Sequence, residues 1–237
     1  MPTKYKRCLL KISGESLAGD NGFGFDQPTI DDIAAQIVEI NRHGVETAVV
    51  VGGGNVWRGL PAANGGMDRY TADQMGMLAT VMNSLSLCAA VQAQGVDCCI
   101  ESAIDMPPVA RLFDMQRTMD ALAAGKVVIF AAGSGHPYFS TDTAAALRAA
   151  EIHADALLMA KKVDGVYDSD PKTNPDAKRF KRLSYLDIIS KELRVMDLTA
   201  AALCRDNNLS IVVFDITKPG NMLKAVKGED IGTIVEV

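Results

Sequence analysis

The junction that decides the fold reads Val45-Glu46-Thr47-Ala48-Val49-Val50-Val51, followed directly by Gly52-Gly53-Gly54-Asn55. The first part is mostly apolar and rich in valine, so it predicts a strand that is buried on both faces. Upstream, apolar residues recur at helical spacing from Ile30 to Ile40, and Gly44 is placed to close that helix. A helix, a buried strand and a glycine-rich loop in this order indicate an α/β protein.

The same alternation continues on both sides of this junction. The expected strands span Arg7–Ser13, Val96–Glu101, Lys126–Ala131, Ala156–Ala160, Ser210–Phe214 and Ile231–Val237. The expected helices span Asp68–Gln94, Asp114–Ala124, Thr141–His153 and Asp197–Asn207, with a short helix after the capping-box residue Ser184. This alternation favours a mainly parallel sheet between layers of helices, and we expect a single domain over residues 1–237.

Composition excludes several classes of protein. The 237 residues are 48% hydrophobic, too apolar for a disordered chain, and the net charge of −5 argues against a dedicated nucleic-acid binder. No uninterrupted apolar run approaches the roughly 20 residues that span a bilayer, so we expect no membrane partner. The apolar stretch near the start soon meets Lys11 and Glu15, which is atypical of a signal peptide. We therefore expect a cytoplasmic protein.

The cysteines and histidines carry no recognisable metal or redox motif. The five cysteines are Cys8, Cys88, Cys98, Cys99 and Cys204. Their number is odd and none forms a CxxC pair, so we expect buried free thiols rather than a zinc site or a redox pair. The three histidines are too scattered to suggest a metal site, and we predict no protein ligands for a metal.

Two glycine-rich loops follow strands, where open α/β sheets bind ligands. Lys11 is a charged residue within an apolar strand that ends at Ser13-Gly14. Because an unpartnered buried lysine is costly, one alternative is that Lys11 faces an anion or a carboxylate. The other is that it lies on an edge strand and points into water. The triplet Gly52-Gly53-Gly54 permits close backbone approach to a ligand, and Arg58 adds an anion-binding guanidinium. The alternative without a ligand is that these glycines only form a tight turn after the strand. Neither GxGxxG nor a P-loop motif occurs in this chain.

A third loop spans Gly133–Thr143 and leads into a helix, whose free N–H groups suit phosphate. Asp142 is either a carboxylate favoured by the helix dipole or a catalytic organiser. Tyr138 and Phe139 either stack on a base or belong to the core. Three phosphate-friendly loops with a strand lysine, an arginine and two aspartates together indicate phosphoryl transfer.

With these residues, the chain resembles the bacterial UMP kinases of the amino-acid kinase superfamily almost end to end. The matching segments are Lys11–Glu15, Val51–Asn55 with Arg58-Gly59, Asp73–Thr80, Gly133–Thr143, Lys162–Tyr167 with Asp170-Pro171, and Val195–Leu198. The glycine triplet is shared across the superfamily, whereas Asp73–Thr80 and Gly133–Thr143 are more specific to UMP kinases.

The resemblance implies a three-layer α/β/α sandwich that converts ATP and UMP to ADP and UDP. It implies a UMP lobe over about 1–153, an ATP lobe over about 154–237, and Mg²⁺ bound mainly through the ATP phosphates. It further implies a homohexamer, GTP activation and UTP inhibition. One departure stands out, because Lys161 occupies a position where relatives carry a small hydroxyl residue.

The resemblance also assigns roles to individual residues. The catalytic group would be Lys11, Arg58, Asp142 and Asp197. ATP would be bound by Lys11, Ile12, Ser13, Gly14, Gly54, Arg58, Lys161, Tyr167 and Asp170. UMP would be bound by Gly53, Arg58, Asp73, Ser134, Gly135, His136, Pro137, Tyr138, Phe139, Ser140 and Thr141.

Two alternatives remain at this point. The first is a superfamily kinase that phosphorylates an acyl group of acetylglutamate, glutamate, aspartate or carbamate, although such enzymes lack the pattern around Asp73. The second is a nonenzymatic relative that stores molybdenum or tungsten. That alternative predicts decay of the charged catalytic positions, but Lys11, Arg58, Asp142 and Asp197 are all charged.

Overall fold

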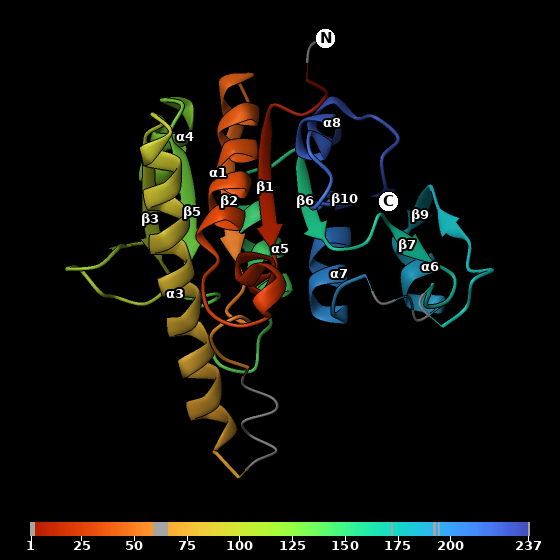
Figure 1. The fold of residues 1–237 in the computed structure, drawn as a ribbon, viewed down its shortest axis with the longest axis horizontal. Helices are drawn as coiled ribbons and strands as arrows, with labels where there is room; N and C mark the ends of the chain where they lie inside the picture. Colours follow the sequence, from red (N-terminus) through yellow and green to blue (C-terminus); the bar gives the residue numbers. More distant parts are fainter. Residues whose placement is uncertain (1–2, 59–65, 172, 192, 194, 237) are drawn as a thin grey trace.

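A single sheet organises the computed structural model, which describes residues 3–58, 66–171, 173–191, 193 and 195–236 (Figure 1). Over these residues the sheet has nine strands in the order β4-β3-β5-β2-β1-β6-β10-β11-β9. Their bounds are β1 Arg7–Ile12, β2 Glu46–Val51, β3 Cys98–Ser102, β4 Arg111–Leu112, β5 Val127–Ala131, β6 Ala156–Lys161, β9 Arg182–Ser184, β10 Ser210–Asp215 and β11 Thr233–Glu236. All neighbouring pairs are parallel except β10 with β11. Gly59 of the expected arginine–glycine motif and Val237 lie outside the described residues.

Helices cover both faces of this sheet, which confirms the predicted three-layer sandwich. One face carries α1 Gln27–Arg42, α3 Arg69–Ala93 and α8 Asn221–Lys227. The other carries α4 Met115–Ala123, α5 Thr141–Glu151, α6 Tyr185–Ser190 and α7 Leu198–Asp206. Successive strand residues point to opposite faces of the sheet: Leu10 packs on the side of α1, α3 and α8, and Leu9 packs on the side of α4 to α7. In Figure 1, α1 and α3 lie in front of the sheet, and α3 extends beyond the carboxyl ends of the strands.

Side-chain caps explain where the longer helices begin. Asp26 accepts a hydrogen bond from Thr29 N at 3.1 Å before α1, and Asp68 accepts one from Thr71 N at 3.0 Å before α3. Such caps satisfy N–H groups that have no partner within the helix. The helix expected up to His153 ends at Glu151, and the strand expected from Val96 begins at Cys98.

Short elements were missed by the sequence analysis because they carry no measurable periodicity. They include β4, β9, α8 and the separate antiparallel pair β7 Val166–Tyr167 and β8 Arg179–Phe180. The loop expected after Ser13 is instead a 3₁₀ helix, Gly14–Asn21, which is interrupted at Gly19. Lys181, between β8 and β9, is an exposed lysine that pairs with Asp230 at 2.9 Å.

The long helix α3 contributes to the core and also presents an apolar outer face. By length and composition it could cross a membrane, but half of its most apolar window is buried inside the fold. Leu87 and Val91 belong to the core beneath it. Of the methionines on this helix, Met77 is buried, whereas Met75 and Met82 are exposed.

Candidate functional site

The predicted ligand loops meet at one edge of the sheet. Because β5, β2, β1 and β6 are adjacent and parallel, their carboxyl ends lie together. The loops that follow β1, β2 and β5 carry Gly14, the glycine triplet and Gly133, respectively. This is the edge at which open α/β sheets bind ligands.

Glycine is required here because backbones approach each other closely. A Cβ atom on Gly14 would lie 2.5 Å from Gly52 O and 2.8 Å from Gly54 N. A Cβ atom on Gly53 would lie 2.7 Å from Gly76 O on α3. The loops after β1 and β2 therefore pack backbone to backbone, an approach that glycine allows because it has no Cβ atom.

A buried amide pair, missed by the sequence analysis, fixes the β2 loop. Asn83 Nδ2 on α3 donates to Gly52 O and to Asn55 Oδ1, both at 2.6 Å. Asn55 Nδ2 in turn donates to Gly24 O at 2.8 Å. Both asparagines are fully buried, so loss of either partner would leave unsatisfied polar atoms. Asn83 shows no local sequence signal, since its partner lies 28 residues away.

Lys11 and Asp142 form an ion pair at the centre of this edge, with Lys11 Nζ 2.6 Å from Asp142 Oδ1. Because β1 lies between β2 and β6, the alternative of an edge-strand lysine is wrong. Both side chains are largely buried. Asp142 lies in the first turn of α5, where the helix dipole favours a carboxylate, and its role as a catalytic organiser stays a prediction. Apart from its ion pair with Lys11, this Oδ1 atom accepts no hydrogen bond from the residues that the structure describes.

The other two predicted catalytic residues lie beside this pair. Arg58 forms an ion pair with Glu15 across the two glycine loops, and both side chains are about half exposed. Asp197 caps α7 by accepting from Ala200 N at 3.0 Å. It also accepts hydrogen bonds from Ser140 and from Thr143 Oγ1, the latter at 3.0 Å. Burial raises the pKa of Asp197, but these hydrogen bonds outweigh that effect and lower it. Asp197 is therefore ionised, and its hydrogen bonds connect the N-terminal ends of α5 and α7.

A cavity of about 290 Å³, here named the β2/β5 cavity, opens between the loops after β2 and β5. Its lining is Gly53, Gly54, Trp57, Arg58, Asp73, Gly76, Met77, Thr80, Gly133, Ser134, His136, Phe139, Ser140 and Thr141. Most of the residues expected for UMP are among them. Gly135 and Pro137 are not, and Tyr138 lines an adjoining hollow that also reaches Asp197. Trp57, Gly76, Met77 and Thr80 also line it, although they were not among the residues expected to bind UMP.

Tyr138 is held in an unusual backbone conformation at this cavity. Its φ is +71°, a region that non-glycine residues seldom adopt. Its N–H donates to Asp73 Oδ2 at 2.9 Å, and Arg69 lies 5.4 Å from the ring centroid. Tyr138 and Phe139 are 61% and 54% exposed, so the alternative that they belong to the core is wrong.

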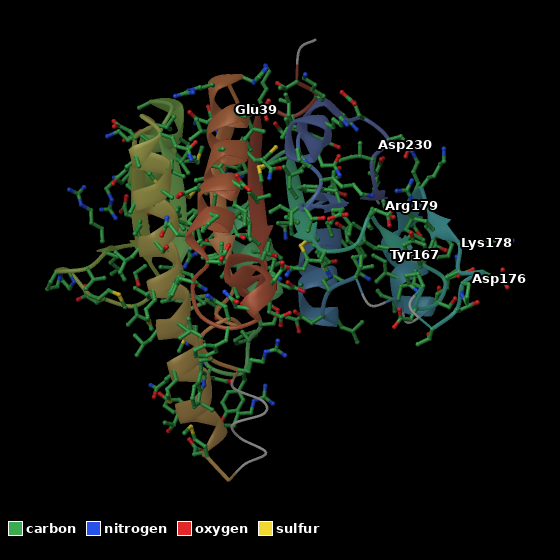
Figure 2. All side chains as sticks on the ribbon, in the orientation of Figure 1. Glu39, Tyr167, Asp176, Lys178, Arg179 and Asp230 are labelled. Carbon is green, nitrogen blue, oxygen red and sulfur yellow. The ribbon has the colours of Figure 1, made fainter. Side chains whose placement is uncertain are left out.

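A second cavity of about 540 Å³, the β6 cavity, lies at the carboxyl end of β6. In the strand order, β1 with Lys11 separates β6 from the strands β2 and β5 of the first cavity. Its lining is Lys161, Val163, Gly165, Val166, Tyr167, Asp168, Ser169, Asp170, Pro171, Lys191, Leu193, Val195 and Val213. Three residues expected for ATP, Lys161, Tyr167 and Asp170, are among them. Figure 2 shows Tyr167 and Arg179 together at the β7–β8 end of the molecule.

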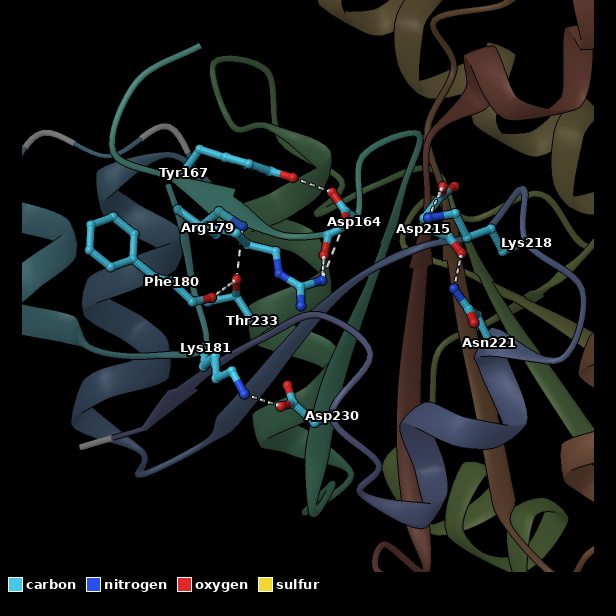
Figure 3. A network of polar contacts seen from close by, with 11 residues as sticks. Asp164, Tyr167, Arg179, Phe180, Lys181, Asp215, Lys218, Asn221, Asp230 and Thr233 are labelled. Carbon is cyan, nitrogen blue, oxygen red and sulfur yellow. Dashed lines mark hydrogen bonds and ion pairs between the residues drawn. The ribbon is translucent and has the colours of Figure 1, made fainter. Parts of the chain in front are cut away.

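A network of polar contacts holds Tyr167, Val166 and Gly165 in place at this second cavity (Figure 3). Tyr167 donates its hydroxyl to Asp164 Oδ1 at 2.7 Å, and Arg179 Nη1 donates to Asp164 O at 2.9 Å. The bond from Tyr167 lowers the pKa of Asp164. Thr233 Oγ1 accepts from Val166 N at 2.8 Å, and Gly165 beside it has a φ of +152°. A Cβ atom on Gly165 would lie 2.7 Å from that hydroxyl.

Lys161 directs its side chain toward the centre of the site. Its Nζ donates to Val195 O at the wall of the β6 cavity. Burial lowers the pKa of Lys161, while Asp142 opposes that shift and Lys11 adds to it. Lys161 therefore lies within electrostatic reach of the Lys11–Asp142 pair and links that pair to the cavity.

The acidic groups suit a metal that arrives with a phosphate ligand. No cluster of three His, Cys, Asp or Glu side chains able to hold a metal occurs in the described part of the chain. The carboxylate oxygens of Asp197 already accept hydrogen bonds from Ser140, from Thr143 and from the first turn of α7. Asp142 Oδ1 is paired with Lys11 Nζ at 2.6 Å, so this carboxylate would face phosphate-bound Mg²⁺ through a water rather than as a direct ligand.

Comparisons with known proteins agree with this arrangement. The model of the amino acid kinase family matches residues 6–215. A crystal structure of UMP kinase from Bacillus anthracis is 39% identical, with 98% of this chain and 96% of that chain covered and a TM-score of 0.95. UMP kinase from Ureaplasma parvum is 40% identical, with 99% and 100% covered and a TM-score of 0.93.

A more distant structure shares the same architecture. Uridylate kinase from Archaeoglobus fulgidus is 29% identical, with 96% of this chain and 99% of that chain covered and a TM-score of 0.74. The family match spans most of the chain, and both bacterial structures cover nearly all of it. The chain is a kinase that belongs to the amino acid kinase family and shares the fold of the UMP kinases.

Proposed function

We propose that this protein transfers the γ-phosphoryl group of ATP to UMP, giving ADP and UDP. The observation that carries the proposal is the placement of two cavities on either side of one buried Lys11–Asp142 pair. Thr141, next to Asp142, lines one cavity, and Lys161, which interacts with Asp142, lines the other. Two nucleotides bound there would present their phosphates to the same lysine. The similarity to UMP kinases supports UMP as the acceptor.

The proposed mechanism is a direct in-line transfer without a covalent enzyme intermediate. Lys11 stabilises negative charge on the transferred group, and Asp142 holds its ammonium in place. Backbone N–H groups around Ser13, Gly14 and Gly54 line the ATP phosphates, as the close packing of these loops allows. Phosphoryl transfer depends on such positioning and preorganised charge.

The acceptor is proposed to occupy the β2/β5 cavity. Gly53, Arg58 and Thr141 would bind the UMP phosphate, and Asp73 would bind the ribose. The loop over Ser134–Ser140 would enclose the nucleoside, with the exposed rings of Tyr138 and Phe139 available to stack. Arg58 would exchange its partner Glu15 for phosphate when the substrate binds.

ATP is proposed to occupy the β6 cavity, with Tyr167 and Asp170 beside the adenine and ribose. Mg²⁺ would bind mainly through the ATP phosphates and would neutralise the charge that develops on them. Asp142 and Asp197 would orient lysine and hydroxyl groups around that metal–phosphate unit rather than ligate the metal directly. Lys161 would add a positive charge on the ATP side.

The lining of the cavities supports the two proposed lobes. The β2/β5 cavity is lined only by residues between Gly53 and Thr141, which lie within 1–153. The β6 cavity is lined only by residues between Lys161 and Val213, which lie within 154–237. The nucleoside of each substrate would therefore belong to one part of the chain, whereas the phosphates of both would meet at Lys11 and the glycine loops, on a central sheet that is continuous.

Self-association is proposed to involve the outer face of α3. Met75, Leu78, Met82 and Leu85 are exposed and recur at intervals of three and four residues along the helix. Such a stripe is typical of helices that pack against a partner. A homohexamer in the cytoplasm with GTP activation and UTP inhibition is the form that we propose. The double variant Leu78→Glu/Met82→Glu should lower the molar mass measured by light scattering.

A coupled ADP-release assay with MgATP tests the activity. UMP, CMP, dUMP, N-acetylglutamate and no acceptor are compared, each with and without GTP and UTP. We expect turnover with UMP well above that without acceptor. Turnover only with N-acetylglutamate would contradict the acceptor assignment, and folded protein inactive with every acceptor would contradict the kinase proposal.

A further inference from the structure

The chain leaves β5 through a turn with an unusual backbone. Three of its residues have positive φ: Ala132 at +62°, Gly133 at +57° and Gly135 at +81°. Two of them are glycines, for which this conformation carries no steric cost, whereas the Cβ atom of Ala132 disfavours it. Gly135 N closes the turn by donating to Ala132 O at 3.0 Å. Because such a conformation persists only where neighbouring structure holds it, a contact from outside the turn must fix Ala132.

The hydroxyl of Thr80 on α3 makes that contact. Ala132 N donates to Thr80 Oγ1 at 2.9 Å, although the two residues lie 52 positions apart in the chain. The same hydroxyl donates to Met77 O at 2.7 Å, so its proton points into the helix and its lone pairs are left for Ala132. Thr80 is 5% exposed and Ala132 is fully buried. Solvent is therefore not available to replace this bond.

The same turn of α3 also packs against the loop after β2. A Cβ atom on Gly53 would lie 2.7 Å from Gly76 O and 3.4 Å from Thr80 N. Thr80, Gly53 and Gly133 all line the β2/β5 cavity. Thr80 therefore lies where α3 meets both loops that are proposed to hold UMP.

We propose that Thr80 is a positioning residue for the acceptor nucleotide, an inference that rests on the proposed UMP kinase function. Through Ala132 N, its hydroxyl holds the start of the β5 loop in the conformation in which Gly133 and Ser134 line the cavity. It acts through this loop and not through a bond to the phosphate or the base of UMP.

Thr80→Val is the decisive substitution, because it removes the hydroxyl and keeps a branched side chain. Ala132 N–H would then be buried without a partner, and Ala132 would relax from its positive φ and move the loop. We expect the KM for UMP to rise about tenfold while kcat changes little, the pattern of lost substrate binding. The KM for ATP should stay constant, since the β6 cavity is lined by other segments.

Two variants separate positioning from stability. Ser84→Ala removes another buried hydroxyl of α3, which donates to Thr80 O at 2.8 Å within the helix. It should lower the free energy of unfolding without changing the KM for UMP. Thr80→Ser keeps the hydroxyl and should retain a KM for UMP close to that of the wild type.

A second substitution in the turn tests the backbone argument. Ala132→Gly introduces the one residue type that adopts positive φ without steric cost. The double variant Thr80→Val/Ala132→Gly should therefore recover most of the UMP affinity that Thr80→Val loses. A double variant that binds UMP as weakly as Thr80→Val would overturn the assignment of the effect to Ala132.

Hydrogen exchange of the ligand-free, full-length protein reports on the loop directly. Peptides that cover residues 131–140 should exchange faster in Thr80→Val than in the wild type or in Ser84→Ala. Circular dichroism confirms that each variant is folded, and Thr80→Ala replaces Thr80→Val if valine prevents folding. Equal exchange in all variants, or an unchanged KM for UMP without the hydroxyl, would overturn the proposal.

The failure of this inference is distinguishable from failure of the proposed function. If the proposed function is wrong, the wild type itself neither binds nor phosphorylates UMP in calorimetric and kinetic assays. If only the role of Thr80 is wrong, the wild type binds UMP and Thr80→Val binds it equally well.

Discussion

The two cavities beside the Lys11–Asp142 pair are built in different ways. The β2/β5 cavity depends on backbone: Gly53 lies against α3 so closely that a Cβ atom would meet Gly76 O at 2.7 Å. The β6 cavity depends on side chains, with Tyr167 and Arg179 both bonded to Asp164. A backbone constraint tolerates almost no substitution, whereas a side-chain network loses its contacts one at a time. Substitutions should therefore affect the two cavities with different severity.

The largest effect is expected at the point where the cavities meet. Lys11→Ala should lower kcat by about 10²–10³-fold, as removal of one preorganised charge-stabilising group does in other enzymes. The KM for UMP should change less. Steady-state kinetics measure both, and Lys126→Ala is the matched control because that exposed lysine is remote from the site.

Stability must be separated from catalysis in this variant, because Asp142 would lose its partner. The double variant Lys11→Ala/Asp142→Asn removes the unpaired carboxylate. It should recover stability in urea unfolding while kcat remains low. Recovery of kcat in the double variant would contradict a direct role for Lys11.

The next largest effect tests the backbone-built cavity. Gly53→Ala places a methyl group 2.7 Å from Gly76 O and 2.9 Å from Ala79 Cβ, so α3 must move. We expect a loss of about 1–3 kcal/mol in the free energy of unfolding, the usual range for overpacking. The KM for UMP should rise while that for ATP stays nearly constant.

Gly76→Ala is the control for this substitution. Its nearest contact would be Trp57 Cδ1 at 3.9 Å, and alanine stabilises a helix interior by roughly 1 kcal/mol relative to glycine. If Gly53→Ala and Gly76→Ala unfold at the same urea concentration, the close approach of the β2 loop to α3 is not a constraint.

An intermediate effect is expected at Lys161, with a defined pH dependence. Burial holds its folded pKa below 10.5, so the charged lysine costs stability at neutral pH. As pH rises through the folded pKa, the unfolded state binds more protons and this cost disappears. Lys161→Thr should therefore unfold at a higher temperature than wild type at pH 7, and the advantage should shrink toward pH 10.5.

The same variant should bind ATP more weakly, by about tenfold, or roughly 1.4 kcal/mol. Calorimetric titration with ATP and with UMP measures the two sites separately. Greater stability combined with weaker ATP binding is typical of a residue kept for function. Weaker UMP binding with unchanged ATP binding would contradict the proposed position of Lys161 beside ATP.

The smallest effect is expected in the side-chain network. Tyr167→Phe removes one hydrogen bond to Asp164 but keeps the ring, so we expect a change of about 1 kcal/mol or less. The KM for ATP should rise by a few fold. Tyr185→Phe removes a hydroxyl bonded to Leu209 O, outside the cavity, and should alter stability without changing the KM for ATP.

Sequence reasoning succeeded where the signal is local. The alternation of strands and helices predicted the layered sheet, and the glycines next to strand ends predicted which loops meet. Lys11 stood out because a charge interrupts an apolar strand. Each of these features is visible within a few residues.

It failed where the contacts join distant segments. Asn83 bonds to the β2 loop from α3, and Thr233 on β11 accepts a hydrogen bond from Val166, 67 residues away. Arg179 reaches Asp164 from the other strand of a two-residue pair that has no periodicity. Such pairings follow from the tertiary fold and leave no trace in spacing.

The most direct test of the account follows the phosphoryl group itself. The protein is mixed with UMP and γ-³²P-labelled MgATP in a single turnover, and the nucleotides are separated. We expect the label to appear in UDP, with one ADP formed per UDP, and Lys11→Ala to slow this transfer by about 10²–10³-fold. Label released as free phosphate, or label retained in ATP by the folded wild-type protein, would contradict transfer between the two cavities.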